Sequence, residues 1–257
     1  MKKTFTMIAV VLLTVLSVQA QRMDADDLGL FNHVGLSVGV GTTGITADLS
    51  LPITPYVAVR GGADIFPLKF NTSLKVEYRN KAAERVFPVS VDVASKVTMN
   101  SGHLLFDFFP SKYSSFHLTA GAYLGGETVG EVYNREDGVL SAVSAFNRIA
   151  PDDQKVGYAL GDYFLTPDEK GNVKGSITAS KFRPYAGIGF GRPVPTKSRV
   201  ACNFDLGVQF WGSPKVKCQG EELKEENLKG DDSGVVKTIA KMPVWPVLNF
   251  RVAVRLF

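Results

Sequence analysis

The chain has 257 residues, with 29 Lys and Arg against 25 Asp and Glu and a formal net charge of +4 at pH 7. So small a bias does not indicate a nucleic-acid partner. Past the N-terminal segment, no apolar run reaches the roughly 18 residues that predict a membrane-spanning helix. The 25 glycines often fall inside strand-like segments, where a soluble sheet rarely keeps them.

The first residues have the pattern of an export signal. Two lysines and an apolar run, Met7–Leu16, precede the small-residue pattern Val18–Ala20, which predicts cleavage before Gln21. The apolar run is shorter than the ~20 residues of a membrane helix, and an uncleaved anchor is the alternative. We predict a signal peptide over 1–20 and one mature domain over 21–257.

Eight segments then alternate with the period of two that a β-strand requires. In chain order they are 33–41, 45–51, 56–65, 102–109, 116–124, 183–191, 203–211 and 248–257. In 33–41, valine or leucine occupies every even position, and glycine or serine occupies every odd position after His33. One face of each segment is therefore apolar, and the other is small or polar.

The connections alternate in length. Short Pro-containing turns at 52–55, 110–114 and 192–197 contrast with the long, charged connections 66–101, 125–182 and 212–247. Short turns on one side and long loops on the other are typical of outer-membrane barrels with periplasmic termini. The turn at Gly41–Gly44 is the one tight turn expected on the long-loop side.

Lipid offers backbone groups no hydrogen-bond partners, so a sheet crosses it only when closed, with its apolar face outward. We predict an all-β fold: a closed antiparallel transmembrane β-barrel of about eight strands, with long extracellular loops, in a Gram-negative outer membrane. A soluble periplasmic β-protein would show the same alternation.

Segments within the long connections leave the strand count open. Leu74–Tyr78 and Val89–Val93 alternate well enough to extend the third and fourth strands, which we prefer, or to form an extra pair that makes ten. Val139, Val143, Phe146 and Ile149 have helical spacing and predict a short amphipathic helix. The residues 170–172 predict a turn back into the sixth strand.

The segments Arg183–Gly191 and Phe204–Phe210 resemble the small outer-membrane β-barrel superfamily, which includes OmpA-type and OmpW-type barrels; the resemblance covers residues 30–257. It implies a porin-like barrel, and for the OmpW type a narrow channel. Family members carry a terminal aromatic residue that the barrel-insertion machinery recognises. Phe257 holds that position, although it is in phase with Arg255 rather than with the apolar face.

Charged residues of both signs fall on the predicted inner face: Asp48, Arg60, Asp64, Asp107, Arg183, Asp205, Arg251 and Arg255. They could form a selectivity surface. Because an eight-stranded interior is barely wider than its side chains, we favour an internal salt-bridge network.

No catalytic, cofactor-binding or metal-binding residue is predicted. The G-x-G-x-x-G pattern at Gly39–Gly44 precedes a strand rather than a helix, so it indicates a hairpin and not a dinucleotide site. The spread of the three histidines (His33, His103 and His117) over separate strands indicates no converging metal ligands.

The two cysteines are predicted to be unpaired. A strand separates Cys202 from Cys218, and about ten strand residues span ~30 Å. A disulfide would need Cα atoms within ~7 Å.

Three functions remain. We prefer a structural or surface-interaction barrel whose long loops bind an extracellular ligand or protein. The alternatives are a narrow channel for small or apolar solutes and, least favoured, an enzyme. Expected partners are outer-membrane lipid and the barrel-insertion machinery, without nucleic acid or cofactor.

Overall fold

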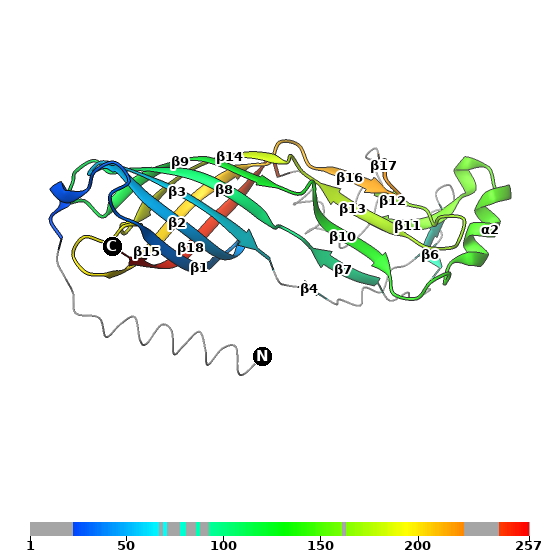
Figure 1. The fold of residues 1–257 in the computed structure, drawn as a ribbon. Coiled ribbons are helices and arrows are strands. Elements are labelled where there is room, and N and C mark those ends of the chain that lie inside the picture. The colour runs from blue at the N-terminus through cyan, green and yellow to red at the C-terminus, as the bar shows by residue number, and fades with distance from the viewer. Residues whose placement is uncertain are drawn as a thin grey trace, which may run out of the picture.

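The chain folds as a closed antiparallel β-barrel of eight strands in a computed structural model, which describes residues 23–66, 69–70, 78–80, 86–87, 93–160, 163–223 and 242–256 (Figure 1). The barrel strands are β1 (Gly35–Gly41), β2 (Gly44–Thr54), β3 (Val57–Ile65), β8 (Ser101–Phe108), β9 (Phe116–Gly125), β14 (Phe182–Phe190), β15 (Val200–Phe210) and β18 (Val244–Arg255). Pairing of β1 with β18, from Gly35↔Arg255 to Gly41↔Asn249, closes the sheet. The predicted eight-stranded all-β barrel is confirmed.

The last strand differs most from its predicted bounds. It begins at Val244 rather than Leu248, and Pro246 lies inside it, opposite Val208 of β15. Proline is usually confined to strand edges because it has no backbone N–H to donate. The regular alternation of apolar residues begins only after it, at Leu248. Here the Pro246 carbonyl accepts a hydrogen bond from the Thr42 hydroxyl at 2.9 Å.

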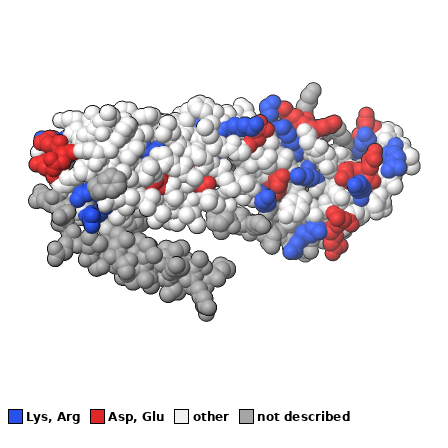
Figure 2. All heavy atoms as spheres, viewed as in Figure 1, with Lys and Arg blue, Asp and Glu red and all other residues white. Residues whose placement is uncertain are grey.

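The barrel is apolar outside and polar inside. Charged side chains cluster at the two ends of the molecule, while the barrel wall between them is largely free of surface charge (Figure 2). Large apolar side chains on the wall are exposed: Leu36, Val38, Val40, Ile45, Leu49, Ile65, Leu104, Phe108, Leu118, Leu124, Phe182, Ile188, Phe190, Phe204, Leu206, Phe210, Leu248 and Phe250. The neighbouring positions along each strand point inward and include most of the buried polar and charged residues.

A second sheet continues the barrel wall at one end. Its order is β17-β16-β13-β10-β7-β4, and its strands from β16 to β4 repeat the order β15-β14-β9-β8-β3 of the barrel strands next to them in the chain. The edge strand β17 pairs with β16. We call this second sheet the outer sheet; it contains β4 (Lys69–Phe70), β7 (Val93–Val97), β10 (Thr128–Asn134), β13 (Lys174–Thr178), β16 (Lys215–Cys218) and β17 (Glu221–Glu222). Val93, the one described residue of the segment Val89–Val93, lies in β7, which leads into the fourth barrel strand as predicted. Tyr78, the one described residue of the segment Leu74–Tyr78, lies instead in β5 (Tyr78–Asn80), a strand of a separate sheet, so it does not extend the third strand. Among the described residues, neither strand adds a pair to the barrel. The rest of the two segments in question, 74–77 and 89–92, lies outside the described residues.

A smaller layer packs on the outer sheet at the end farthest from the barrel. It consists of β12 (Tyr163–Leu165), β11 (Val156–Leu160), β5 (Tyr78–Asn80) and β6 (Val86–Phe87), with α2 (Ser141–Ile149) and the 3₁₀ turn η2 (Asp152–Gln154). Leu165 and Tyr163 pack against Cys218 and Val216 of the outer sheet. The helix lies where the apolar spacing predicted it. Within the described ranges, no helix is long and apolar enough to cross a bilayer.

The short turns close the opposite end of the barrel. Arg192, in the turn after β14, donates hydrogen bonds to carbonyls of both other turns: Pro55 (3.1 Å), Ser111 (3.1 Å), Lys112 (2.6 Å) and Ser114 (3.0 Å). Its guanidinium also lies over the Phe109 ring, 4.2 Å from the centroid. One side chain thus joins all three turns.

The N-terminal segment is fixed to this end. The turn η1 (Ala25–Asp27) carries Asp26, and the Lys112 ammonium donates to its carboxylate, which raises the pKa of Lys112. The predicted signal peptide, the cleavage site before Gln21 and the terminal Phe257 all lie outside the described residues.

Candidate functional site

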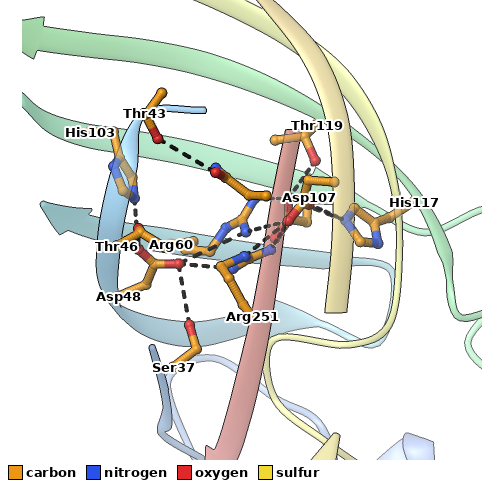
Figure 3. A network of polar contacts seen from close by, with 12 residues as sticks. Ser37, Thr43, Thr46, Asp48, Arg60, His103, Asp107, His117, Thr119 and Arg251 are labelled. Atoms are coloured by element: carbon orange, nitrogen blue, oxygen red, sulfur yellow. Dashed lines mark hydrogen bonds and ion pairs between the residues drawn. The ribbon is translucent and has the colours of Figure 1, made fainter. Parts of the chain in front are cut away.

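The barrel interior is crossed by a network of ion pairs (Figure 3). Five of its members, from five strands, are at most 2 % exposed: Asp48, Arg60, Asp107, Asp205 and Arg251. Arg251 Nη1 lies 2.8 Å from Asp48 Oδ2, and Arg251 Nε lies 2.9 Å from Asp205 Oδ2. This guanidinium therefore links carboxylates that come from opposite ends of the chain.

Arg60 repeats the arrangement on β3. Its Nη2 lies 3.1 Å from Asp107 Oδ1, and its Nη1 lies 3.5 Å from Asp205 Oδ2 and 4.0 Å from Asp48 Oδ2. Asp48 and Asp205 are thus shared by both arginines. A buried charge is costly unless it is paired and hydrogen-bonded. Each of these five side chains has at least one oppositely charged partner, although Arg60 Nε and Asp107 Oδ2 have no hydrogen-bond partner among the described residues.

His103 extends the network toward the outer sheet. Its Nε2 lies 2.9 Å from Asp48 Oδ1, and its Nδ1 lies 2.8 Å from Asp64 Oδ2. Tyr123 of β9 covers the ring, with centroids 4.9 Å apart. The histidines lie on separate strands, as predicted, but the side chains of Asp48, Asp64 and His103, from β2, β3 and β8, converge across the narrow lumen.

His117 ends the network on the side of the short turns. Its Nε2 lies 3.2 Å from Asp205 Oδ1 and 3.9 Å from Asp107 Oδ1. Its Nδ1 faces the backbone carbonyl of Ser115 at 3.3 Å. Figure 3 shows His103 and His117 on opposite sides of the two arginines.

Hydroxyl groups add hydrogen bonds to three of the carboxylates. Each donates one hydrogen bond to a network aspartate: Ser37 to Asp48 (3.2 Å), Thr46 to Asp48 (3.0 Å), Thr43 to Asp64 (2.9 Å) and Thr119 to Asp107 (2.7 Å).

Two arginines predicted for this network lie elsewhere. Arg183 is buried, but it donates to the carbonyls of Ser180 (2.8 Å) and Gly126 (2.7 Å) at the outer-sheet end. Arg255 donates to the carbonyl of Pro195 (2.8 Å) at the opposite end. Both side chains are long enough to reach a rim of the barrel, where backbone carbonyls accept from them.

Glycines on the inner face make room for the network. A Cβ placed on Gly62 would lie 2.4 Å from Asp48 Oδ1 and 2.8 Å from His103 Nε2. A Cβ on Gly189 would lie 2.4 Å from His117 Nε2. Close approach of large side chains thus explains why glycine alternates with apolar residues in these strands.

Aromatic residues fill the lumen between the network and the outer sheet. Tyr123 and Tyr185 pack with Leu105 and Val247, and Trp211 stacks on Trp245 with centroids 4.9 Å apart. Among the described side chains, the space left around the network is a cavity of ≈ 10 Å³. That is about the space one water molecule needs, so side chains fill the lumen at the level of the network.

A polar hollow lies on the outer sheet. It has a volume of ≈ 450 Å³, and its lining includes Lys96, Glu131, Tyr133, Asp168 and Lys174. Lys174 and Glu131 pair across it at 3.3 Å. In the part of the chain that the structure describes, no group of three or more His, Cys, Asp or Glu side chains is arranged to hold a metal ion.

The cysteines are free, as predicted: Cys202 is exposed on the outer face of β15, and Cys218 is buried. Burial raises the pKa of the Cys218 thiol.

No family model matches the chain, and no curated protein matches it by sequence. The membership in the OmpA or OmpW type that the sequence suggested therefore stays a prediction. Among solved structures, CarO from Acinetobacter baumannii is 17 % identical and covers 88 % of this chain and 99 % of its own, with a TM-score of 0.51. CarO2 from the same organism is 16 % identical over 87 % and 98 %, with a TM-score of 0.48. A major outer membrane protein from Thermus thermophilus is 12 % identical over 87 % and 98 %, with a TM-score of 0.31. At these identities, the likeness to CarO shows that the chain shares its barrel fold.

Proposed function

We propose that the protein is an outer-membrane barrel that is closed to ions and acts, without enzymatic activity, through the outer sheet. The observation that carries this proposal is the filled lumen: the ion pairs of the network leave a cavity of ≈ 10 Å³ around them. A barrel that conducts ions needs a continuous aqueous path, and side chains occupy that path here.

The exterior supports a membrane location. The exposed apolar side chains cover the barrel wall on all sides, and a continuous patch of this size far exceeds the few hundred Å² that a soluble monomer usually exposes. Eleven-residue strands such as β2 and β15 have the length that a tilted transmembrane strand needs, about 9–11 residues. Removal of residues 1–20 during export is part of the same proposal.

Electrostatics support closure. An ion that entered the network would have to separate Arg60 or Arg251 from a buried carboxylate. Removing one partner of a desolvated pair costs about 3–5 kcal/mol. The barrier would add to the steric block from Tyr123 and Tyr185, which lie next to the network.

The outer sheet offers the surface for an interaction. It extends the barrel by continuous strands, it carries charged residues of both signs (Figure 2), and it holds the polar hollow of ≈ 450 Å³. The volume falls in the range of small-ligand sites, about 300–1,000 Å³. We place this sheet outside the cell and the three short turns in the periplasm, because transmembrane barrels have their short turns there.

Planar-bilayer recording of the purified, refolded protein at neutral pH tests closure. We expect no steady single-channel steps. Steady steps whose ion preference shifts in Arg60→Gln, with heat-dependent gel migration unchanged, would instead support the narrow channel.

Antibody labelling of intact cells tests the orientation. An epitope inserted between the exposed residues Glu169 and Lys170 should be labelled without permeabilisation. The matched insertion after Lys197, in the short turn, should be labelled only once the cells have been permeabilised. The reverse pattern would invert the topology, and recovery of the protein in the soluble periplasm would refute the membrane location.

A further inference from the structure

The segment before β1 lies across the short-turn end of the barrel (Figure 1). It contacts each of the three short turns: Met23 N donates to the Thr196 carbonyl (2.9 Å), the Asp26 carboxylate accepts from Lys112 (2.8 Å), and Phe31 N donates to the Pro52 carbonyl (2.8 Å). Ala25 and Leu28 of the segment are buried. The segment is therefore a folded part of the molecule rather than a loose tail.

The chain turns sharply at Gly29–Asn32. The Asn32 backbone N–H donates to the Gly29 carbonyl (3.4 Å), and the Gly29 N–H donates to the side-chain carbonyl of Asn32 (2.9 Å). Phe31, the third residue of this turn, has φ = +55°. Glycine and asparagine favour this left-handed conformation, in which the Cβ of other residues is crowded. A phenylalanine therefore occupies a position that does not suit its backbone.

Both residues at the tip of this turn are large, apolar and exposed. Leu30 is 68 % exposed and Phe31 is 53 % exposed. Turn tips that face water usually carry Gly, Asn, Asp, Ser or Pro. A turn that presents two uncovered apolar side chains, one of them on an unfavourable backbone conformation, indicates that an apolar phase surrounds the tip.

The apolar barrel wall starts beside this tip. The hydrogen bond from Phe31 N to the Pro52 carbonyl joins the turn to the last residues of β2. The outer face of β2 exposes Ile45 and Leu49. The tip therefore continues the apolar surface of the barrel past the end of its second strand.

The character of the surface changes at the same level. Tyr56 and Tyr113, in or next to the first two short turns, are exposed. Tyrosine is enriched where a membrane meets water, because its ring is apolar and its hydroxyl is polar. Within the N-terminal segment, the exposed acidic residues Asp26 and Asp27 precede the apolar tip. These residues mark the boundary between water and lipid at the short-turn end.

We propose that the Leu30–Phe31 turn is a lipid-binding anchor, which inserts into the membrane leaflet at the short-turn end of the barrel beside β2. A protein partner would also cover apolar side chains, but the continuity of the tip with the apolar wall favours lipid. The inference rests on the membrane location in the proposed function and adds a lipid contact outside the barrel strands.

Tryptophan fluorescence in vesicles tests the lipid contact. Leu30→Trp and Phe31→Trp each place a reporter at the tip, and the mature proteins are refolded into phosphatidylcholine vesicles with or without bromine atoms on the acyl chains. Bromine quenches the emission of a tryptophan only on close contact. Trp211 and Trp245, the two tryptophans of the chain, pack among buried side chains, so the wild-type emission is subtracted.

Two matched variants give the limits of the signal. Leu49→Trp places the reporter on the barrel wall, and Glu169→Trp places it at an exposed position between β12 and β13. We expect brominated lipid to quench both tip variants as strongly as Leu49→Trp and to leave Glu169→Trp unchanged. Heat-dependent gel migration shows that each variant is folded, and Leu30→Trp provides the reporter if Phe31→Trp does not fold.

The other outcomes separate the two proposals. Quenching of Leu49→Trp without quenching of the tip variants would overturn the anchor and leave the membrane barrel in place. If the tip emission lies at short wavelength but does not respond to brominated lipid, protein covers the turn, for example a second copy of the chain, and the lipid contact is refuted. A folded Leu49→Trp that is not quenched would refute the membrane location itself.

Discussion

Arg251 and Asp205 form a forked ion pair inside the barrel: Nε and Nη2 of Arg251 both donate to Oδ2 of Asp205. The two residues lie on the paired strands β18 and β15, where the direct cross-strand partner of Arg251 is Asn203. The pair is therefore diagonal, and this leaves Nη1 free to reach Asp48 on β2. The Arg251 guanidinium thus connects β18 with β15 and β2, next to the β1–β18 pairing that closes the barrel.

Replacing Arg251 with an uncharged residue should destabilise the barrel strongly. Arg251→Met leaves Asp205 and Asp48 buried with less compensating charge, and loss of one partner from a buried pair costs about 3–5 kcal/mol. We expect a lower urea midpoint for loss of the heat-modifiable gel form. Arg251→Met/Asp205→Asn should recover part of the loss.

The matched control is Lys197→Met, which removes an exposed cation from a short turn. Its stability should change by less than about 0.5 kcal/mol, as is usual for surface substitutions. Equal effects of the buried and the exposed substitution would contradict the structural role of the network.

Inner-face glycines should not tolerate a methyl group. In Gly189→Ala the new Cβ would lie 2.4 Å from His117 Nε2 and 2.8 Å from Asp205 Oδ1. Overpacking of this kind costs about 1–3 kcal/mol, so the urea midpoint should fall. Gly130→Ala in β10, where a Cβ meets nothing within 4 Å, is the control and should be neutral. An unaffected Gly189→Ala would show that the interior is looser than described.

The turn arginine should not be replaceable by lysine. Arg192 donates to four carbonyls in two other turns, and a single ammonium cannot span them as a planar guanidinium does. Arg192→Ala should lower stability by about 1–3 kcal/mol, with Arg192→Lys recovering only a fraction. Full recovery of stability in Arg192→Lys, measured by the same urea titration, would show that only the positive charge of Arg192 stabilises the turns.

The two thiols should react differently. Cys202 is exposed on the apolar outer face of the barrel, so in micelles an apolar maleimide should label it and a charged maleimide should not. Cys218 is buried and its pKa is raised, which lowers the fraction of reactive thiolate at neutral pH, so neither reagent should label it until urea unfolds the protein. Rapid labelling of native Cys218 would argue against the small core under the outer sheet.

The eight barrel strands could be predicted from the sequence because each carries its own two-residue period. Val38 and Phe204 must lie on the outer face, because their neighbours along the strand are small or polar. The positions of Asp48, Arg60, Asp107, Asp205 and Arg251 on the inner face follow from the same period.

The partners inside the lumen could not be predicted this way. The two-residue period assigns a residue to the inner or outer face, but it does not say how far a long side chain reaches along the barrel. The sequence therefore could not show that Arg183 and Arg255 bind rim carbonyls whereas Arg60 binds carboxylates inside the lumen. His103 lies on the same, inner face of its strand as Asp107, and His117 lies on the same face as Thr119. This shared face was the one sequence feature that could have placed both histidines in the network. The short outer strands were missed in part because apolar residues there alternate over only a few positions.

The joints between barrel and outer sheet have a mechanical consequence. Only a few residues separate β9 from β10, β13 from β14 and β15 from β16. The strands of the outer sheet follow the same order as the barrel strands next to them in the chain. The outer sheet is therefore joined to the barrel wall through five strands, whereas the β1–β2 hairpin turns at Gly41–Gly44 and has no extension into the outer sheet. A force applied to α2 at the far end would therefore reach the barrel through these five strands, on one side of its wall only.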